Sequence, residues 1–140
     1  MGTLGTTVVN SEPNNQLLSE FKTMENNSIL SSMQILQKLP LLSDLESVTE
    51  KYENLTTCMK QQESSGGVKN YNPKDTDGKE KFGCLHFDKD TFSDFCVKKY
   101  YLATIDNIMD CNIQTTCSSL MIEDGYIGRW GKRTLNNCYN

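Results

Sequence analysis

The sequence predicts an all-α fold in which four to five helices form a small disulfide-stapled bundle. Apolar residues recur at three- and four-residue intervals along most of the chain, and no run of alternating residues indicates strands. The 140 residues include six cysteines, an even number, all from Cys58 onward. Because only 36% of the residues are apolar, we expect disulfides to reinforce a core of modest size.

The sequence divides into a disordered tail over residues 1–13 and a single helical, disulfide-rich domain over residues 14–140. The tail is small, polar and aperiodic, which is typical of disorder. Residues 63–83 are rich in Gly, Asn, Asp and Lys, which predicts a long polar loop. A loop of this length is uncommon in a compact domain unless it is functional or disordered.

The first helix is expected to begin at Asn14 and to end at Pro40, because proline cannot continue a helix. Asn26-Asn27-Ser28 would interrupt it, with Ser28 as the cap of a second segment. Its apolar stripe consists of Leu17, Phe21 and Met24, followed by Ile29, Leu30, Met33 and Leu36.

The next helix carries the clearest signals. Ser43 and Glu46 have the spacing of a capping box, in which each side chain satisfies a backbone amide of the first turn. The short link from Leu39 to Leu42 favours a helical hairpin with the preceding helix. A core stripe in an antiparallel bundle explains the apolar spacing better than a free-standing coiled coil does. That stripe is Leu41, Leu45, Val48, Tyr52, Leu55 and Met59.

Two further helices are expected after the polar loop. The third would be capped by Asp90 or Thr91 and would end at Cys111. A fourth is expected over 113–122, and the glycines of 125–131 break regular structure after it. The inner side of the third helix is predicted to comprise Phe92, Phe95, Cys96, Leu102, Ile105 and Met109.

The cysteines fit three disulfides better than a metal site. None forms a C-x-x-C pair, and His86 is the single histidine, so a zinc site would need thiolates almost alone. Residues 75–78 are similar to a calcium loop, but Pro73 and Cys84 stand where an EF-hand needs acidic ligands. We therefore expect no metal and no cofactor. Spacing alone leaves fifteen possible pairings of Cys58, Cys84, Cys96, Cys111, Cys117 and Cys138.

The cysteines also indicate an extracellular protein, because disulfides persist in oxidising compartments. Asn26 and Asn54 begin acceptor sequons for N-glycosylation, although both also suit ordinary polar positions of a helix. No signal peptide is visible, so a secreted protein would have lost it before this numbering begins. The first six residues also match the pattern for N-myristoylation at Gly2, which would indicate a cytosolic protein instead of a secreted one. If the protein is secreted, Met1-Gly2 is a remnant of expression.

Charge and hydropathy exclude two classes of partner. The formal net charge is −4 and there is no basic run, which argues against binding to nucleic acid or to anionic lipid. No stretch approaches the roughly 18 apolar residues of a membrane span. The oligomeric state stays open.

Little in the sequence indicates catalysis, and we expect a protein that is not an enzyme. His86 is the one imidazole, and the cysteines beside which a catalytic histidine would stand are expected to be bonded. A hydrolase would need two convergent carboxylates in a cleft. The candidates for such a pair are Asp88, Asp90, Asp94, Glu123 and Asp124, which otherwise read as caps and solvated surface.

The favoured function is therefore a secreted protein-recognition or signalling module that binds an extracellular protein or receptor. Tyrosine, tryptophan and arginine dominate binding hot spots, and they gather near the C-terminus. The candidate binding residues are Tyr126, Arg129, Trp130, Lys132 and Arg133, although Trp130 is equally suited to the core. A carrier of a small apolar ligand is the first alternative, and a small carboxylate-based hydrolase is the second.

Two cysteine-aromatic strings carry a resemblance to a known family. Residues 84–87 read Cys-Leu-His-Phe, residues 92–96 read Phe-Ser-Asp-Phe-Cys, and the helix before them ends near Cys58. Over residues 41–117 this spacing resembles the nematode secreted cysteine-rich domains grouped as a domain of unknown function, number nineteen in that series. The resemblance implies disulfide-stapled helices, an extracellular location and no enzymatic activity.

Overall fold

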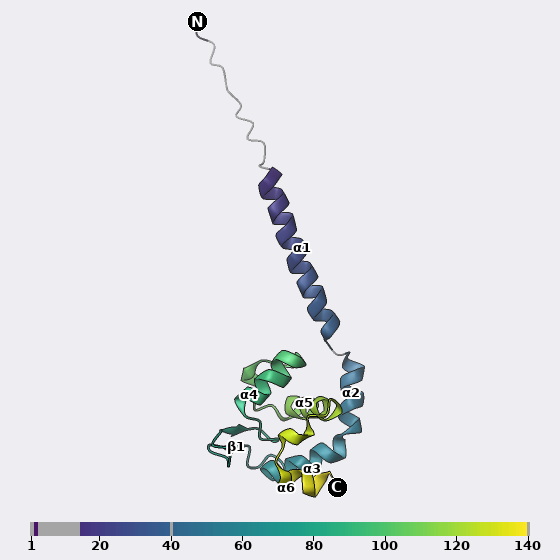
Figure 1. Ribbon diagram of the computed structural model, residues 1–140, viewed down its shortest axis with the longest axis vertical. Helices are drawn as coiled ribbons and strands as arrows, with labels where there is room; N and C mark the ends of the chain where they lie inside the picture. Colours follow the sequence, from purple (N-terminus) through teal and green to yellow (C-terminus); the bar gives the residue numbers. More distant parts are fainter. Residues whose placement is uncertain (1, 3–14, 40, 140) are drawn as a thin grey trace. The chain divides into compact units, whose positions relative to one another are not determined.

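The computed structural model describes residues 2, 15–39 and 41–139 (Figure 1). The chain divides into two units, Met1–Lys38 and Leu39–Asn140, so the predicted domain over 14–140 is described in two parts. Apart from Gly2, the tail predicted over residues 1–13 lies outside the described residues.

Within the first unit the structure describes one long helix, α1, over Asn15–Lys38. It runs through Asn26-Asn27-Ser28 without a break, so the predicted interruption is wrong. Ser28 caps no second segment; its carbonyl accepts a hydrogen bond from Ser32 Oγ at 2.9 Å, in register with the helix. Large apolar side chains are exposed along α1, namely Met24, Ile29, Leu30, Met33 and Leu36.

The second unit begins with α2 (Leu42–Lys51) and α3 (Glu53–Ser64), which are separated by a break at Tyr52 with φ −108° and ψ 13°. The predicted capping box does not form. The helix begins before Ser43, at Leu42, with Leu41 as its N-cap and no side chain bonded to the first turn. Leu41 directly follows Pro40, has an extended conformation, and its carbonyl accepts the first helical hydrogen bonds.

A short hairpin lies within the predicted polar loop. Strands β1 (Tyr71–Asn72) and β2 (Lys81–Phe82) pair antiparallel, with Tyr71 opposite Phe82. Phe82 also bridges to Phe87, so the segment is anchored to the core side of the unit. The polar loop therefore contains a small sheet within a mostly helical fold, and strands of two residues leave no detectable alternation in a sequence.

The predicted third helix is much shorter than expected. It comprises α4 (Lys89–Phe92), followed directly by a π-helix, η1 (Ser93–Lys99), and the helix ends at Tyr100. Its cap is Asp88, whose carboxylate accepts from the Thr91 backbone N–H at 2.9 Å, and not Asp90 or Thr91.

A short 3₁₀ turn, η2 (Ile105–Asn107), leads into α5 (Cys111–Glu123). Cys111 begins this helix, with Asp110 as the cap, and does not end the third one. The predicted fourth helix over 113–122 is confirmed within α5. A further 3₁₀ turn, η3 (Ile127–Arg129), and α6 (Lys132–Cys138) complete the unit.

Helix α5 is the centre of the second unit, and α2, α3, η1 and η3 all pack against it (Figure 1). Three disulfides join elements of the second unit to one another. Cys58–Cys138 joins α3 to α6, Cys84–Cys111 joins the loop after β2 to the start of α5, and Cys96–Cys117 joins η1 to α5. All six cysteines are paired, as predicted.

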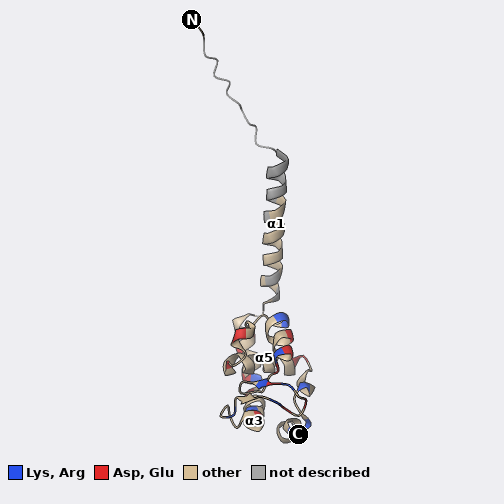
Figure 2. Ribbon diagram, turned by 90° about the vertical axis from the view of Figure 1, so that its left-hand side faces the viewer, with Lys and Arg blue, Asp and Glu red and all other residues tan. Residues whose placement is uncertain are grey.

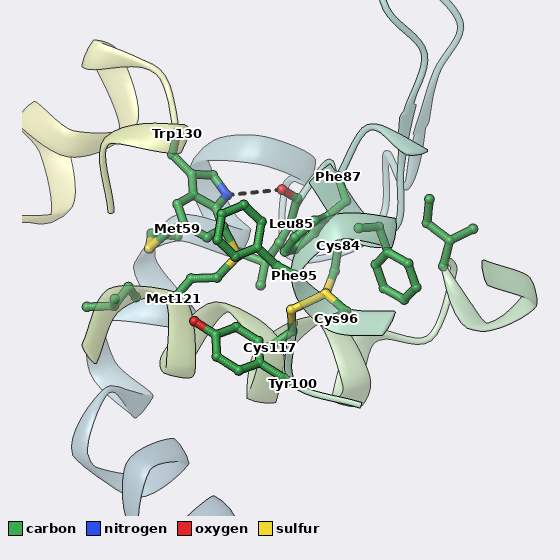
Figure 3. Close-up of a cluster of buried hydrophobic side chains, with 13 residues drawn as sticks. Met59, Cys84, Leu85, Phe87, Phe95, Cys96, Tyr100, Cys117, Met121 and Trp130 are labelled. Carbon is green, nitrogen blue, oxygen red and sulfur yellow. Dashed lines mark hydrogen bonds between the residues drawn. A yellow bond between two sulfur atoms is a disulfide. The ribbon is translucent and has the colours of Figure 1, made fainter. Parts of the chain in front are cut away.

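The core lies between α5 and the segment from residue 84 to residue 100 (Figure 3). Trp130 is 8% exposed and its indole N–H donates to the Leu85 carbonyl at 3.2 Å. The core consists of Met59, Leu85, Phe87, Phe92, Phe95, Tyr100, Ile108, Met121, Ile122 and Trp130, with Cys84, Cys96 and Cys117. The protein is thus a mostly helical, disulfide-stapled small domain, with α1 as a separate unit.

Candidate binding surface

Two of the carboxylates proposed for hydrolysis, Asp88 and Asp90, share Lys79 as a partner, and the others have separate partners. Asp90 pairs with Lys79 at 3.1 Å and Asp94 with Lys98 at 3.0 Å. Glu123 and Asp124 are neighbours in sequence, but Glu123 bonds to Lys51 and Tyr52 while Asp124 accepts from the Tyr100 hydroxyl at 2.8 Å. Among the proposed acids, Asp88 and Asp90 therefore line a common open hollow, where the Lys79 ammonium pairs with both.

His86 is held as part of a turn. It has φ +53°, and its Nε2 lies 2.7 Å from the Lys69 carbonyl oxygen. Its Nδ1 faces Glu63 Oε2 at 3.7 Å, while the other carboxylate oxygen of Glu63 accepts from Thr134 at 2.6 Å. The adjoining cavity has a volume of about 70 Å³, well below the roughly 300 Å³ of the smallest typical ligand pockets.

Asp88 and Lys81 form the most buried ion pair on the hairpin side, with 3.5 Å between Lys81 Nζ and Asp88 Oδ2. Burial would raise the pKa of Asp88, but hydrogen bonds from the Thr91 amide and hydroxyl and the charges of Lys81 and Lys79 outweigh it. The pKa of Asp88 is therefore lowered. Lys81 also donates a hydrogen bond to Asp77 at 2.7 Å, so its ammonium group lies between the carboxylates of Asp77 and Asp88.

Replacing Asp88 with alanine is expected to lower the free energy of unfolding by about 1–3 kcal/mol at pH 7. The change removes a helix cap and leaves the buried Lys81 with Asp77 as its one remaining ion-pair partner among the described residues. Because the pKa of Asp88 is depressed in the folded state, its contribution is present above the ordinary carboxyl pKa of about 3.9 and disappears as the pH falls through the lower folded value.

Urea denaturation of both proteins between pH 7 and pH 2.5 measures this effect. Asp90→Ala is the matched control, because Asp90 is exposed and its one ion pair among the described residues is with Lys79. We expect that control to cost less than about 1 kcal/mol. Equal losses for the two variants, or a loss for Asp88→Ala that does not shrink in acid, would contradict this role of Asp88.

A group of aromatic and basic side chains forms a second feature, which we call the aromatic–basic patch: Phe95, Lys99, Tyr100, Tyr126 and Arg129. The Phe95 and Tyr126 rings meet edge to face at 4.8 Å between centroids. The Arg129 guanidinium lies over Phe95 at 5.4 Å, and Lys99 Nζ lies 5.6 Å from the ring centroids of both Tyr100 and Tyr126. Cations and aromatic faces thus alternate across the patch.

Two backbone features assemble the patch. In the π-helix η1 the Tyr100 N–H donates to the Phe95 carbonyl at 2.8 Å, which brings the two rings to 6.4 Å. At the end of α5, Gly125 has φ +85°, and the Tyr126 N–H donates back to Met121 at 2.7 Å. The left-handed conformation of Gly125 ends the helix and turns the chain, so that the Tyr126 ring contacts the Phe95 ring. π-Helical turns are rare and often lie at functional sites.

Exposure separates the base of the patch from its rim. Phe95 and Tyr100 are buried, whereas Tyr126 is 38% exposed and the Lys99 and Arg129 side chains are exposed. Burial raises the pKa of the Tyr100 hydroxyl, and its hydrogen bond to Asp124 adds to this, so the residue stays neutral. The rim therefore presents two cations and a tyrosine on a rigid aromatic base.

The structure brings together only some of the predicted binding residues. Tyr126 and Arg129 lie in the patch, but Trp130 is in the core and is not available to a partner (Figure 3). Lys132 and Arg133 are exposed in the first turn of α6, and among the described residues neither makes a cation–π contact with a ring of the patch. Phe95, Lys99 and Tyr100 were not among the predicted binding residues, although the run Lys98-Lys99-Tyr100-Tyr101 is a second aromatic-basic signal.

The predicted glycosylation sites are both accessible. Asn26 is exposed on α1 and Asn54 is exposed in the first turn of α3. The threonine of the second sequon, Thr56, is fully buried and bonds to the carbonyls of Tyr52 and Glu53. That threonine therefore has a structural role in addition to any part in the sequon.

Known proteins add no information on function, because searches of family models, curated proteins and solved structures gave no significant match to this chain. The described helices include none that is both long and apolar enough to cross a membrane. Within the described part of the chain, no three acidic, histidine or cysteine side chains are grouped so that they could hold a metal ion.

Proposed function

We propose that this protein is a secreted, non-enzymatic recognition module that binds another extracellular protein through the aromatic–basic patch. The observation that carries the proposal is the exposed Arg129 and Tyr126 packed on the buried Phe95 ring. Arginine and tyrosine contribute most of the binding energy in many interfaces. A rim fixed by ring contacts also loses little side-chain entropy when a partner binds.

The three disulfides support an extracellular setting, because such bonds are rare in reducing compartments. The charge of the rim indicates the partner. Lys99 forms an ion pair with Asp124, with 3.5 Å between Nζ and Oδ2, but Arg129 has no acidic partner among the described residues. A protein surface that offers a carboxylate beside an apolar side chain would match both the free guanidinium and the tyrosine ring.

The test is a binding screen of the full chain against a panel of secreted proteins and receptor ectodomains, measured by biolayer interferometry. For any partner found, Arg129→Ala and Tyr126→Ala are each expected to weaken binding at least about tenfold, which corresponds to about 1.4 kcal/mol. Matched controls are Lys132→Ala and Arg133→Ala, which remove exposed cations from α6.

The control variants are expected to change the affinity less than about twofold, because charges outside the contact area contribute little to the affinity. Near-UV circular dichroism verifies that each variant is folded. A partner whose affinity falls equally with the patch variants and the α6 variants would contradict recognition through the patch and would indicate attraction by general charge.

A further inference from the structure

An apolar groove lies between α2 and α5, apart from the residues of the aromatic–basic patch. It consists of two adjoining hollows of about 320 Å³ and about 200 Å³, which share Leu45 and Thr116. Both are open to solvent and their surfaces are mainly apolar. We call this feature the α2–α5 groove: Leu42, Leu45, Leu102, Ile113 and Thr116, with Glu46, Thr49 and Glu50 along its α2 edge.

The floor of the groove exposes apolar side chains at the edge of the core, since Leu102 and Ile113 also pack against it. Leu42 is 72% exposed, and Leu45, Leu102 and Ile113 are each half-buried. Leu42 and Leu45 are three residues apart on α2, as are Ile113 and Thr116 on α5, so each helix presents one short stripe to the groove. Contiguous exposed apolar surface with a polar border is typical of an interaction site.

The border of the groove is acidic and unpaired. Glu46 and Glu50 are four residues apart on α2 and both exposed, and no ion pair or hydrogen bond of their side chains occurs among the described residues. Like charges at this spacing repel each other. Other exposed acids of the unit, such as Asp90 and Asp94, have lysine partners, and Figure 2 shows acidic and basic residues interspersed over its helices.

We propose that the α2–α5 groove binds a basic amphipathic helix of a partner protein. Helices bind such grooves through apolar side chains three and four residues apart, and the groove itself is formed by two helices with no exposed strand edge at its border. Lysine or arginine beside those apolar anchors would pair with Glu46 and Glu50. The chain's net charge of −4 adds a long-range attraction of the same sign.

Two fluorescein-labelled helical peptides of ~18 residues test the proposal by fluorescence anisotropy with the full chain. They share the same leucine positions and differ only in carrying lysine or glutamate at the polar positions. The lysine peptide is expected to bind at least about tenfold more tightly than the glutamate peptide, because only it complements the acidic border. Glu46→Lys and Glu50→Lys are each expected to weaken its binding about fivefold or more, and Leu42→Ser to weaken it similarly.

Glu53→Lys is the matched control, since Glu53 is an exposed acid on α3 outside the groove and the variant changes the net charge equally. It is expected to change affinity less than about twofold. A double variant, Glu46→Lys with Glu50→Lys, is expected to improve binding of the glutamate peptide. The proposal is overturned if all charge variants act alike, if the two peptides bind equally well, or if neither binds at about 100 μM.

Discussion

Replacing Gln114 with alanine is expected to lower the free energy of unfolding by about 3–5 kcal/mol, the largest effect of any single substitution outside the disulfides. Gln114 is fully buried on α5. Its Oε1 accepts from the Leu85 N–H at 2.8 Å, and its Nε2 donates to the carbonyls of Phe82, at 2.7 Å, and Ile108. One side chain thus joins the hairpin, the loop after it and the segment before α5.

The backbone leaves space for this amide at Gly83. A Cβ built there would lie 2.1 Å from Gln114 Nε2, and the residue has φ +75°, which also favours glycine. Alanine at position 114 would leave the buried Leu85 N–H and Ile108 carbonyl without their partner and would also create a cavity. The Phe82 carbonyl would keep its hydrogen bond from the Phe87 N–H at 3.0 Å.

Two further variants separate these contributions in urea denaturation. Gln114→Met fills most of the volume without restoring hydrogen bonds, so we expect it to remain about 2–4 kcal/mol below the native protein. Asn112→Ala, an exposed site on the same helix, is expected to change stability by less than about 0.5 kcal/mol. If Gln114→Met were as stable as the native protein, packing and not hydrogen bonding would explain the burial of Gln114.

The sequence was informative wherever a signal spans many residues. Of the apolar stripe from Leu41 to Met59, the later members Tyr52, Leu55 and Met59 lie in or against the core as predicted, whereas Leu41 is exposed and Leu45 lines the α2–α5 groove. The even number of cysteines correctly predicted disulfides. Asp88 was recognised as a capping residue, but the cap was placed later because Asp90 and Thr91 are equally good caps by residue type. Local signals therefore identified the element but not its boundary.

The parts that could not be predicted depend on tertiary structure. The stripe from Phe92 to Met109 has helical spacing, yet the chain leaves the helix at Tyr100 and a capped 3₁₀ turn follows at Thr104. Trp130 read equally well as a binding or a core residue, and the acceptor that decides between them, the Leu85 carbonyl, is 45 residues away in sequence. The aromatic–basic patch likewise needs the π-helix η1, for which no sequence rule was available.

Removing the Cys58–Cys138 disulfide is expected to lower the free energy of unfolding by about 4–5 kcal/mol, measured with the double variant Cys58→Ser and Cys138→Ser. The two residues are 80 positions apart, so the bridge closes a long loop and restricts the unfolded chain strongly. The Cys84–Cys111 bridge spans only 27 positions. The double variant Cys84→Ala with Cys111→Ala is therefore expected to lower the free energy of unfolding somewhat less, by about 3–4 kcal/mol from the lost loop closure.

The Cys58–Cys138 bridge also determines whether α6 stays folded. Helix α6 has only seven residues, and isolated helices of that length are not stable in water. Side-chain hydrogen bonds also join it to α3, among them Thr134 to Glu63 at 2.6 Å, which is partly shielded from water, and Asn137 to Gln62 at 2.8 Å, which is exposed. We therefore expect amide hydrogens of 132–138 to exchange much faster in the double variant, while those of the central helix α5 keep their protection relative to the global stability. If α6 remained protected and stability fell by less than about 2 kcal/mol, the hydrogen bonds to α3 would be sufficient to hold the C-terminal helix without its disulfide.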